Sequence, residues 1–381
     1  MRNAPTDPLP LAQALIRCPS VTPVEGGALG VLEAALRPLG FTCTRLTFGE
    51  VDNLFARRGT GGPHLCYAGH TDVVPPGAEG WTEDPFGAVV RDGVLYGRGA
   101  CDMKGGIAAF VAGLTDFLAT HPDHEGSISL LITGDEEGPS VDGTAKVLEW
   151  MAANGQIPDM ALVGEPTSKA ELGDVTKIGR RGSMTAYITV RGIQGHSAYP
   201  QRADNPVHRL IRVLHRLTAE PLDQGSAWFE PSTLQVTGFD VGNTASNVIP
   251  AAARAFLNIR FNDLHSSAAL TARIRAVIEA EAPDHDLAVS VSGESFLTAP
   301  GPFVEALKRA IRRATGRETR LDTGGGTSDA RFIARYCPVA ELGGVGSTMH
   351  QVNECVPVRE LRDLAALYRT VLEECLAGSR R

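Results

Sequence analysis

Five short segments of the chain combine glycine or proline with histidine, aspartate or glutamate, residue types that bind metal ions and transfer protons. They are residues 69–72 (GHTD), 99–106 (GACDMKGG), 134–138 (GDEEG), 164–167 (GEPT) and 349–350 (MH). Imidazole and carboxylate groups without a thiolate suit zinc or cobalt. Any one segment alone is typical of an ordinary turn or helix cap. Five of them together favour a metal-dependent active site.

The carboxylates in these segments fit the chemistry of a two-metal hydrolase. Two divalent ions ~3.5–4 Å apart need a carboxylate that bridges them. Asp102, held between Gly99 and Gly105, is the natural bridge. Glu136 and Glu137 are adjacent and cannot easily point the same way, so we expect one to bind metal and the other to act as a general base.

The elements that must position these segments follow from the apolar pattern. Short apolar runs at 64–68, 128–133 and 161–163 indicate buried strands, and each precedes one of the segments. Apolar residues at helical spacing predict helices over 29–39, ended by Gly40, and over 107–118. This alternation predicts an α/β domain whose mixed, largely parallel sheet is flanked by helices. Ligands of such sheets bind beyond the carboxyl ends of the strands.

The pattern changes after Gly182. Apolar and polar residues alternate over 184–191, which is typical of a strand with one wet face. Further half-polar strands are expected at 234–239, 255–261 and 287–291, with helices at 206–217 and 270–280. The helical pattern of the first domain resumes at 302–314. We therefore predict a catalytic domain of residues 1–178 and 295–381, interrupted by an α+β domain of residues 179–294 with an antiparallel sheet and two helices.

Composition excludes several classes of protein. The 381 residues carry 36 Lys and Arg against 44 Asp and Glu, a net charge of −8 that argues against nucleic-acid binding. No apolar run approaches the ~20 residues of a membrane span. The first twenty residues contain four prolines and Asp7, unlike a signal peptide. The seven cysteines form no C-x-x-C pair. We expect a cytoplasmic protein without nucleic-acid or membrane partners.

The chain resembles the two-metal amidohydrolases, the superfamily of carboxypeptidases, acetylornithine deacetylases and aminoacylases. The resemblance lies in 70–77 (HTDVVPPG), 96–106 (YGRGACDMKGG), 135–138 (DEEG), 164–168 (GEPTS), 195–200 (GHSAYP) and 349–354 (MHQVNE). Four more segments are similar to the succinyl-diaminopimelate desuccinylase branch: 179–183 (GRRGS), 203–209 (ADNPVHR), 245–250 (ASNVIP) and 323–333 (TGGGTSDARFI). The resemblance extends over nearly the whole chain.

This resemblance implies a set of metal ligands. His70, Asp102 and Glu165 would hold one ion. Asp102, Glu137 and His350 would hold the other. Two Zn²⁺ ions per subunit are implied, with Co²⁺ as a substitute.

The resemblance also implies catalytic roles. Glu136 would be the general base and then the general acid, and Asp72 would orient the His70 imidazole. His196 would stabilise the oxyanion from the inserted domain of a partner subunit, which implies a homodimer formed through that domain.

One departure from the family lies beside the bridging aspartate. Cys101 stands where the family more often has alanine, and we interpret it as a small buried filler rather than a ligand. The Asp102–Met103 peptide that follows is cis in the family.

Substrate recognition is implied at residues that match the carboxylate-binding positions of the desuccinylases. These are Arg180, Arg181, Asn247, Arg260, Gly326, Thr327 and Ser328. Arginine suits bidentate recognition of a carboxylate. The implied reaction is hydrolysis of N-succinyl-LL-diaminopimelate to succinate and LL-diaminopimelate, in lysine and diaminopimelate biosynthesis.

Two alternatives remain open. The same chemistry could serve an acetylornithine deacetylase or a related N-acyl-amino-acid amidohydrolase or carboxypeptidase. A metal-binding scaffold without catalysis is the second alternative, and it predicts that Glu136 is dispensable.

Overall fold

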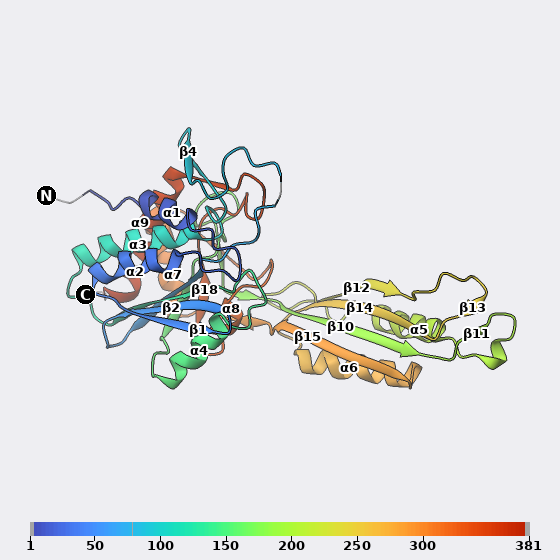
Figure 1. Ribbon diagram of the computed structural model, residues 1–381. Coiled ribbons are helices and arrows are strands. Elements are labelled where there is room, and N and C mark those ends of the chain that lie inside the picture. Colours follow the sequence, from blue (N-terminus) through green and yellow to red (C-terminus); the bar gives the residue numbers. More distant parts are fainter. Residues whose placement is uncertain (1–3, 78, 378–381) are drawn as a thin grey trace. The chain divides into compact units, whose positions relative to one another are not determined.

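The computed structural model describes residues 4–77 and 79–377 (Figure 1). The chain forms two compact units. The first, called here the discontinuous unit, comprises Met1–Ile178, Thr298–Asp322 and Ser328–Arg381. The second, called the inserted unit, comprises Gly179–Leu297 and Thr323–Thr327.

The discontinuous unit is built on an eight-stranded sheet. Its strands are Thr42–Phe48 (β1), Val51–Arg58 (β2), His64–His70 (β3), Ser127–Thr133 (β6), Met160–Val163 (β7), Val175–Lys177 (β8), Arg320–Asp322 (β17) and Val339–Glu341 (β18). Their order across the sheet is β1-β2-β6-β3-β7-β18-β8-β17. β3 runs parallel to both β6 and β7, whereas β2 is antiparallel to its neighbours. The predicted mixed, largely parallel sheet flanked by helices is confirmed.

Helices cover both faces of this sheet. They are Leu9–Ile16 (α1), Ala28–Leu36 (α2), Lys104–Thr120 (α3), Thr144–Ala153 (α4), Pro302–Thr315 (α7), Ala330–Ile333 (α8) and Val358–Leu376 (α9). Figure 1 shows α1, α2, α3 and α9 on one face and α4 on the other. The rings of Tyr67 and Phe110 stack with centroids 3.9 Å apart, and Tyr368 packs edge-on against both. These contacts join β3, α3 and α9 in one core.

The predicted helix over 29–39 is divided in the structure. The α-helical part, α2, ends at Leu36, and a 3₁₀ turn, Arg37–Leu39 (η1), follows. Pro38 has no backbone N–H, which weakens the continuation of the helix at this point. Gly40 ends the turn with a left-handed φ of 83°, the conformation that glycine adopts most readily. The predicted stop at Gly40 is confirmed.

A small three-stranded sheet joins two distant parts of the discontinuous unit. It contains Val89–Arg91 (β4), Val94–Tyr96 (β5) and Cys355–Pro357 (β19), in the order β19-β5-β4. The pairing of β5 with β19 brings the segment after Tyr96 close to the segment before Cys355.

The inserted unit is a four-stranded antiparallel sheet with two helices. The strands are Gly182–Arg191 (β10), Thr233–Asp240 (β12), Ala252–Phe261 (β14) and His285–Gly293 (β15), in the order β12-β14-β10-β15. The helices are Pro206–Thr218 (α5) and Ser267–Glu281 (α6). Two short ladders pair Gly179–Arg180 (β9) with Phe296–Leu297 (β16), and Gly195–His196 (β11) with Val248–Ile249 (β13), and a 3₁₀ turn, Pro200–Arg202 (η2), follows β11. The predicted antiparallel sheet with two helices is confirmed.

Local sequence explains where the helices of the inserted unit begin. Asn205 precedes α5, and its side-chain oxygen accepts a hydrogen bond from the Val207 N–H at 3.0 Å. Pro206 occupies the first helical position, where its missing N–H costs nothing. Ser266 caps α6 in the same way, accepting from the Ala269 N–H at 3.2 Å. Alternate residues of β10 and β14 pack against both helices to form the core of this unit.

Within the described part of the chain, no helix combines the length and apolarity needed to cross a membrane.

Candidate active site

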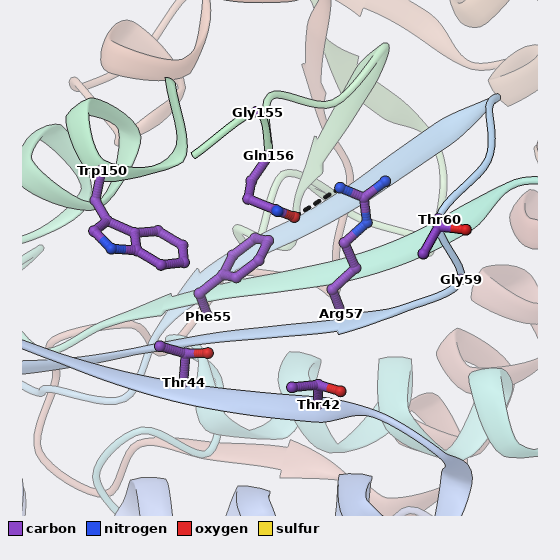
Figure 2. Close-up of a pocket in the computed structure, with 9 residues that line it drawn as sticks. All are labelled: Thr42, Thr44, Phe55, Arg57, Gly59, Thr60, Trp150, Gly155 and Gln156. Carbon is purple, nitrogen blue, oxygen red and sulfur yellow. Dashed lines mark hydrogen bonds between the residues drawn. The ribbon is translucent and has the colours of Figure 1, made fainter. Parts of the chain in front are cut away.

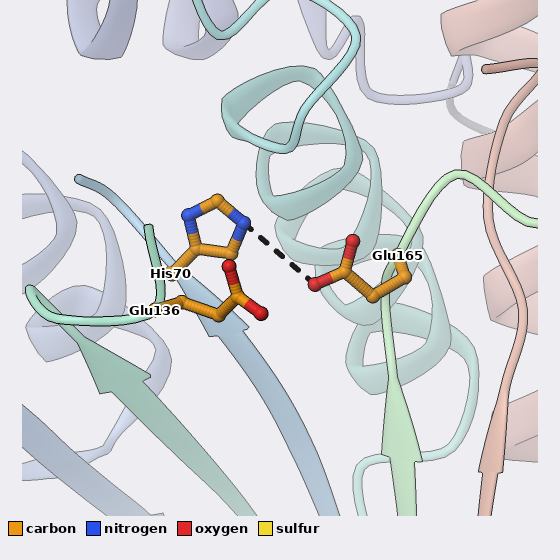
Figure 3. Close-up of side chains that lie close together, drawn as sticks. All are labelled: His70, Glu136 and Glu165. Carbon is orange, nitrogen blue, oxygen red and sulfur yellow. Dashed lines mark ion pairs between the residues drawn. The ribbon is translucent and has the colours of Figure 1, made fainter. Parts of the chain in front are cut away.

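The carboxyl ends of three adjacent parallel strands meet at one edge of the main sheet. His70 is the last residue of β3, Glu136 follows β6, and Glu165 follows β7. Figure 3 shows these three side chains pointing toward one another. One ligand atom from each lies within 4.8 Å of the other two. A divalent cation could therefore contact all three.

Asp102 lies between two imidazoles. Its Oδ1 is 3.2 Å from His70 Nε2, and its Oδ2 is 3.5 Å from His350 Nε2. His350 Nε2 is also 2.8 Å from Glu137 Oε1, and Glu165 Oε1 is 3.7 Å from His70 Nε2. The two oxygens of one carboxylate thus face two separate groups of nitrogen and oxygen donors. This is the arrangement that a bridging ligand requires.

The chemistry of the donor set fits divalent cations. Burial raises the pKa of Glu136 to about 8 and that of Glu165 well above its ordinary value, with neighbouring carboxylates adding to the increase. Burial lowers the pKa of His70, but hydrogen bonding to Asp102 and Asp72 outweighs it and raises the value. Carboxylates crowded in this way ionise readily beside a bound cation. Two imidazoles and four carboxylates, with no thiolate, suit zinc-type ions.

Asp72 supports two parts of the site at once. Its main-chain oxygen is 2.9 Å from His70 Nδ1, and its carboxylate Oδ1 is 3.5 Å from the same nitrogen. The two carboxylate oxygens accept hydrogen bonds from the backbone N–H groups of Glu136 and Glu137, at 3.2 and 3.0 Å. Asp72 therefore holds the imidazole and also the loop that carries both glutamates.

Sequence reasoning missed Glu354, which holds the backbone around Asp102. Glu354 is fully buried, and its Oε1 accepts from the N–H groups of Cys101 and Asp102 at 2.9 and 3.0 Å. Its Oε2 accepts from Arg98 Nη1 at 2.7 Å. Glu354 is the last residue of the MHQVNE segment, so the motif contained a signal for it. The buried ion pair orients the backbone that presents the bridging carboxylate.

A second missed residue is Asp329, from the TGGGTSDARFI segment. It is buried and accepts a hydrogen bond from Thr144 Oγ1 at 2.6 Å. Burial raises the pKa of Asp329. Its negative charge also contributes to the raised pKa of Glu136.

Glycines are required where the backbone at the site is tightly packed. A side chain at Gly164, immediately before Glu165, would overlap the Tyr67 hydroxyl. A side chain at Gly343 would overlap the Glu165 carbonyl oxygen. The backbone on either side of Glu165 is therefore packed too closely for a Cβ at Gly164 or at Gly343.

Cys101 takes no part in the donor groups of the described residues. Its thiol donates to the Val345 carbonyl at 3.3 Å, and burial raises the pKa of the thiol. It is therefore a neutral buried side chain, as the sequence predicts. The Asp102–Met103 peptide is cis, also as expected.

The remaining expected site residues belong to the inserted unit, except Ser328. Arg180 Nη1 donates to the carbonyl of Gly326 at 3.0 Å. Arg260 pairs with Ser183 at the start of β10, and burial together with Arg181 lowers the pKa of the Arg260 guanidinium. Thr327 ends the second segment of this unit. The structure therefore brings the arginines and Gly326 to one end of β10.

His196 and Asn247 lie beyond the other end of that strand. His196 is exposed in β11, which pairs with β13 immediately after Asn247. The Asn247 carbonyl accepts from the Ser197 N–H at 2.9 Å. Ser328, in the discontinuous unit, donates through its hydroxyl to Glu341 Oε1 at 2.8 Å.

The fold and the donor set at its sheet edge are those of a peptidase family. The chain matches the model of peptidase family M20/M25/M40 over residues 66–374, and it belongs to this family.

Named relatives refine this class. The chain is 62% identical over 377 residues to the succinyl-diaminopimelate desuccinylase of Gluconacetobacter diazotrophicus, with 98% of each chain covered. It is 59% identical over 367 residues to that of Acidiphilium cryptum, covering 96% of this chain and 98% of the relative. Among solved structures, it resembles aminopeptidase PepT from Bacillus cereus, with a TM-score of 0.78 and 21% identity over 97% of this chain and 98% of that one. The last similarity shows the fold alone.

Proposed function

We propose that this protein hydrolyses the amide of N-succinyl-LL-diaminopimelate to succinate and LL-diaminopimelate, in lysine and diaminopimelate biosynthesis. The observation that carries the proposal is a half-buried glutamate, Glu136, beside a cluster of imidazole and carboxylate donors around Asp102. Amide hydrolysis needs a base at such a position. The identity of 62% to a desuccinylase over 98% of both chains supports this substrate.

The donor geometry supports a site for two Zn²⁺ ions per subunit, with Co²⁺ as a substitute. His70, Asp102 and Glu165 would hold one ion. Asp102, Glu137 and His350 would hold the other. When bound, such ions activate a water molecule for attack and polarise the amide carbonyl.

Glu136 is the proton carrier in this proposal. Glu136 and Glu165 both approach His70, but Glu165 also lies within ion-pair distance of that imidazole. We therefore assign Glu165 as a ligand and Glu136 as the base. Its carboxylate takes the proton of the attacking water and then gives it to the departing amine nitrogen. Asp72 keeps the base in position by accepting the Glu136 backbone N–H.

The layout of the inserted unit supports a homodimer. Arg180 precedes β10 and His196 follows it, so the ten residues of this strand separate them. At about 3.3 Å per residue this amounts to about 30 Å, too far for both to contact the same scissile amide. A second copy of the chain would supply His196. The Ala198 N–H donates to His196 Nδ1 at 3.1 Å, which favours the neutral tautomer with its proton on Nε2, a donor for an oxyanion.

Substrate binding is assigned to the other end of β10. Arg180, Arg260, Gly326 and Thr327 lie there and would bind the carboxylates of the substrate, whereas Asn247 lies beside His196 at the opposite end and would bind the substrate from the second copy. Arg180 is already anchored by the Gly326 carbonyl, which limits the freedom it loses on binding.

Seven free cysteines, all among the described residues, support a reducing compartment such as the cytoplasm. Partners other than substrate and a second copy are not expected.

Steady-state kinetics of the zinc-loaded protein test the proposed function. We expect kcat/KM for N-succinyl-LL-diaminopimelate to exceed that for N-acetylornithine by at least ~100-fold, since polar groups built for a second carboxylate reject a ligand that lacks it. A preference for acetylornithine would replace this proposal with the deacetylase. Absence of hydrolysis of either, with metal bound, would favour the scaffold.

A further inference from the structure

A cavity of about 410 Å³ lies in the discontinuous unit, away from the donor cluster (Figure 2). Its floor is the face of β1 and β2 that carries Thr42, Thr44, Phe55 and Arg57. Its other wall is Trp150, from α4, with residues 155–156 that follow the helix. Pockets of this size hold small organic molecules.

The cavity holds a cation without a counter-charge. Arg57 is half-buried; its Nη1 donates to Gln156 Oε1 at 2.7 Å and its Nη2 to Ser127 Oγ at 2.9 Å. Both partners are neutral, and Arg57 Nε is buried with no hydrogen-bond partner in the structure. No carboxylate of the described residues forms an ion pair with this guanidinium. Burial and, second in size, the positive charge of Arg57 lower the pKa of His64 to about 4.

Next to this cation the cavity has an aromatic wall. The rings of Phe55 and Trp150 lie with centroids 5.5 Å apart and planes tilted by 58°. Figure 2 shows both rings to one side of Arg57, with Thr42 and Thr44 on the neighbouring strand. The lining contains neither Asp nor Glu. A ligand with an ammonium group would thus find no carboxylate and would be repelled by Arg57, whereas an apolar body would find aromatic contacts.

The carbonyls at the end of α4 do not offset the charge of Arg57. The N–H groups of Asn154, Gly155 and Gln156 donate back to the last turn of the helix, at 2.8–3.4 Å. These bonds satisfy the oxygens that would otherwise form the negative end of the helix dipole.

The cavity is not an extension of the catalytic edge. Arg57 pairs with Ser129 near the start of β6, and Ser127 is the first residue of that strand. The glutamates of the site follow Thr133, at its other end. Six residue steps of about 3.3 Å separate the two ends, or about 20 Å.

We propose that this cavity is a binding site for a small monocarboxylate with an apolar body. The carboxylate would pair with the Arg57 guanidinium through the Nη protons that Gln156 and Ser127 leave free, a two-point geometry that arginine favours. The apolar body would lie against Phe55 and Trp150. This inference is independent of the proposed hydrolysis, because it uses none of the residues of the catalytic edge.

Calorimetric titration of the metal-loaded protein with cyclohexanecarboxylate tests the site, and Trp150 emission provides a local readout. We expect one saturable site per chain with a Kd below about 10 mM. Cyclohexanecarboxamide, the neutral isostere, should bind at least about tenfold more weakly, because the charge-assisted pair is lost. Inorganic sulfate should also bind more weakly, because it has no apolar body.

Three variants locate the binding. Arg57→Gln should lower the affinity for cyclohexanecarboxylate by at least about tenfold. Arg57→Lys, which keeps the positive charge but not the planar guanidinium, should lower it by less. Trp150→Phe should keep the binding and lose the emission change. Both Arg57 variants should retain hydrolytic activity, which shows that they are folded.

Three results would overturn the proposal: no saturable binding, equal affinity of Arg57→Gln and the unaltered protein, or equal affinity for acid and amide. Carboxylate that binds only at the catalytic edge would compete with substrate, leave Trp150 emission unchanged and persist in Arg57→Gln.

Discussion

The two units of this chain distribute apolar and charged side chains in opposite ways. Among the described residues, fifteen large apolar side chains are exposed, and ten of them lie in Gly179–Leu297, which is less than a third of the chain. The discontinuous unit instead covers both faces of its main sheet and buries charged residues such as Arg98, Lys104 and Glu354. Exposed apolar side chains are typical of a surface that binds another protein. Buried charged side chains are typical of a site where charges act in a low dielectric.

One face of the inserted sheet illustrates the difference. Residues on the helix side of β10 are buried, whereas Tyr187 on the other side is 45% exposed. Phe256 of β14 packs edge-on against it and is 39% exposed. Several ion pairs in this unit are also exposed, as for Arg191 with Asp284. The comparison predicts that substitutions in the discontinuous unit change chemistry and stability, and that those in the inserted unit act through association.

The largest expected effect is on turnover. Glu136→Gln removes the base but keeps the size of the side chain, and we expect kcat to fall by about 10³-fold, within the range for loss of a general base. Metal content, measured by atomic emission, should be unchanged. Glu149→Gln, on the exposed surface of α4, is the matched control and should keep full activity. Full activity of Glu136→Gln would assign the base elsewhere.

The next effect is on stability. Glu354→Gln leaves the buried Arg98 guanidinium without its counter-charge, which costs about 3–5 kcal/mol of unfolding free energy. Denaturant unfolding measures this. Glu281→Gln breaks two ion pairs on the surface of the inserted unit, with Arg212 and Arg216, and should change stability little. Equal losses in both variants would contradict the contrast between the units.

A smaller effect depends on pH. Burial, with Arg57 nearby, lowers the pKa of His64 from 6.5 to about 4, so the folded state keeps this imidazole neutral while the unfolded chain takes up a proton. Stability is therefore lost as pH falls from 6.5 toward 4. After allowance for solvent screening, we expect about 2 kcal/mol.

Denaturant unfolding of the unaltered protein and of His64→Gln at pH 7 and pH 5 measures the stability that His64 loses on acidification, because glutamine has no proton to gain. His208→Asn, on the exposed surface of α5, serves as the control and should follow the unaltered protein. The His64 explanation fails if His64→Gln loses as much stability as the unaltered protein on acidification.

The smallest expected signal is a partial recovery of activity, and it tests the inserted unit. His196→Ala and Glu136→Ala should each be nearly inactive. If His196 acts across a dimer, mixing them with subunit exchange should restore about a quarter of the activity, because half of the dimers are mixed and each has one intact site. No recovery, with exchange verified by mass spectrometry, would place His196 within its own chain.

Much of this organisation could be predicted from sequence because apolar periodicity is local. Buried runs located β3, β6 and β7, and parallel strands bring their carboxyl ends together, so the meeting of His70, Glu136 and Glu165 followed. The bridging position of Asp102 followed from its place between Gly99 and Gly105, and the resemblance added the role of His350.

Other features depend on contacts between residues that are distant in sequence. Glu354 reaches Asp102 only because two three-residue strands, β5 and β19, pair across more than 250 positions, and strands so short leave no periodic signal. The cavity at Arg57 arises where the turn after α4 crosses two antiparallel strands. No sequence motif predicts that these segments come together.

The two carboxylate oxygens of Asp72 have a consequence for engineering. Because the carboxylate of this residue lies 3.5 Å from Nδ1 of a ligand, His70, and accepts the backbone N–H of the proton carrier, Glu136, we expect a substitution at position 72 to change metal affinity and proton transfer together. A selection that alters one of these properties alone must therefore find its mutations elsewhere. At position 72, we expect metal affinity and proton transfer to change only together.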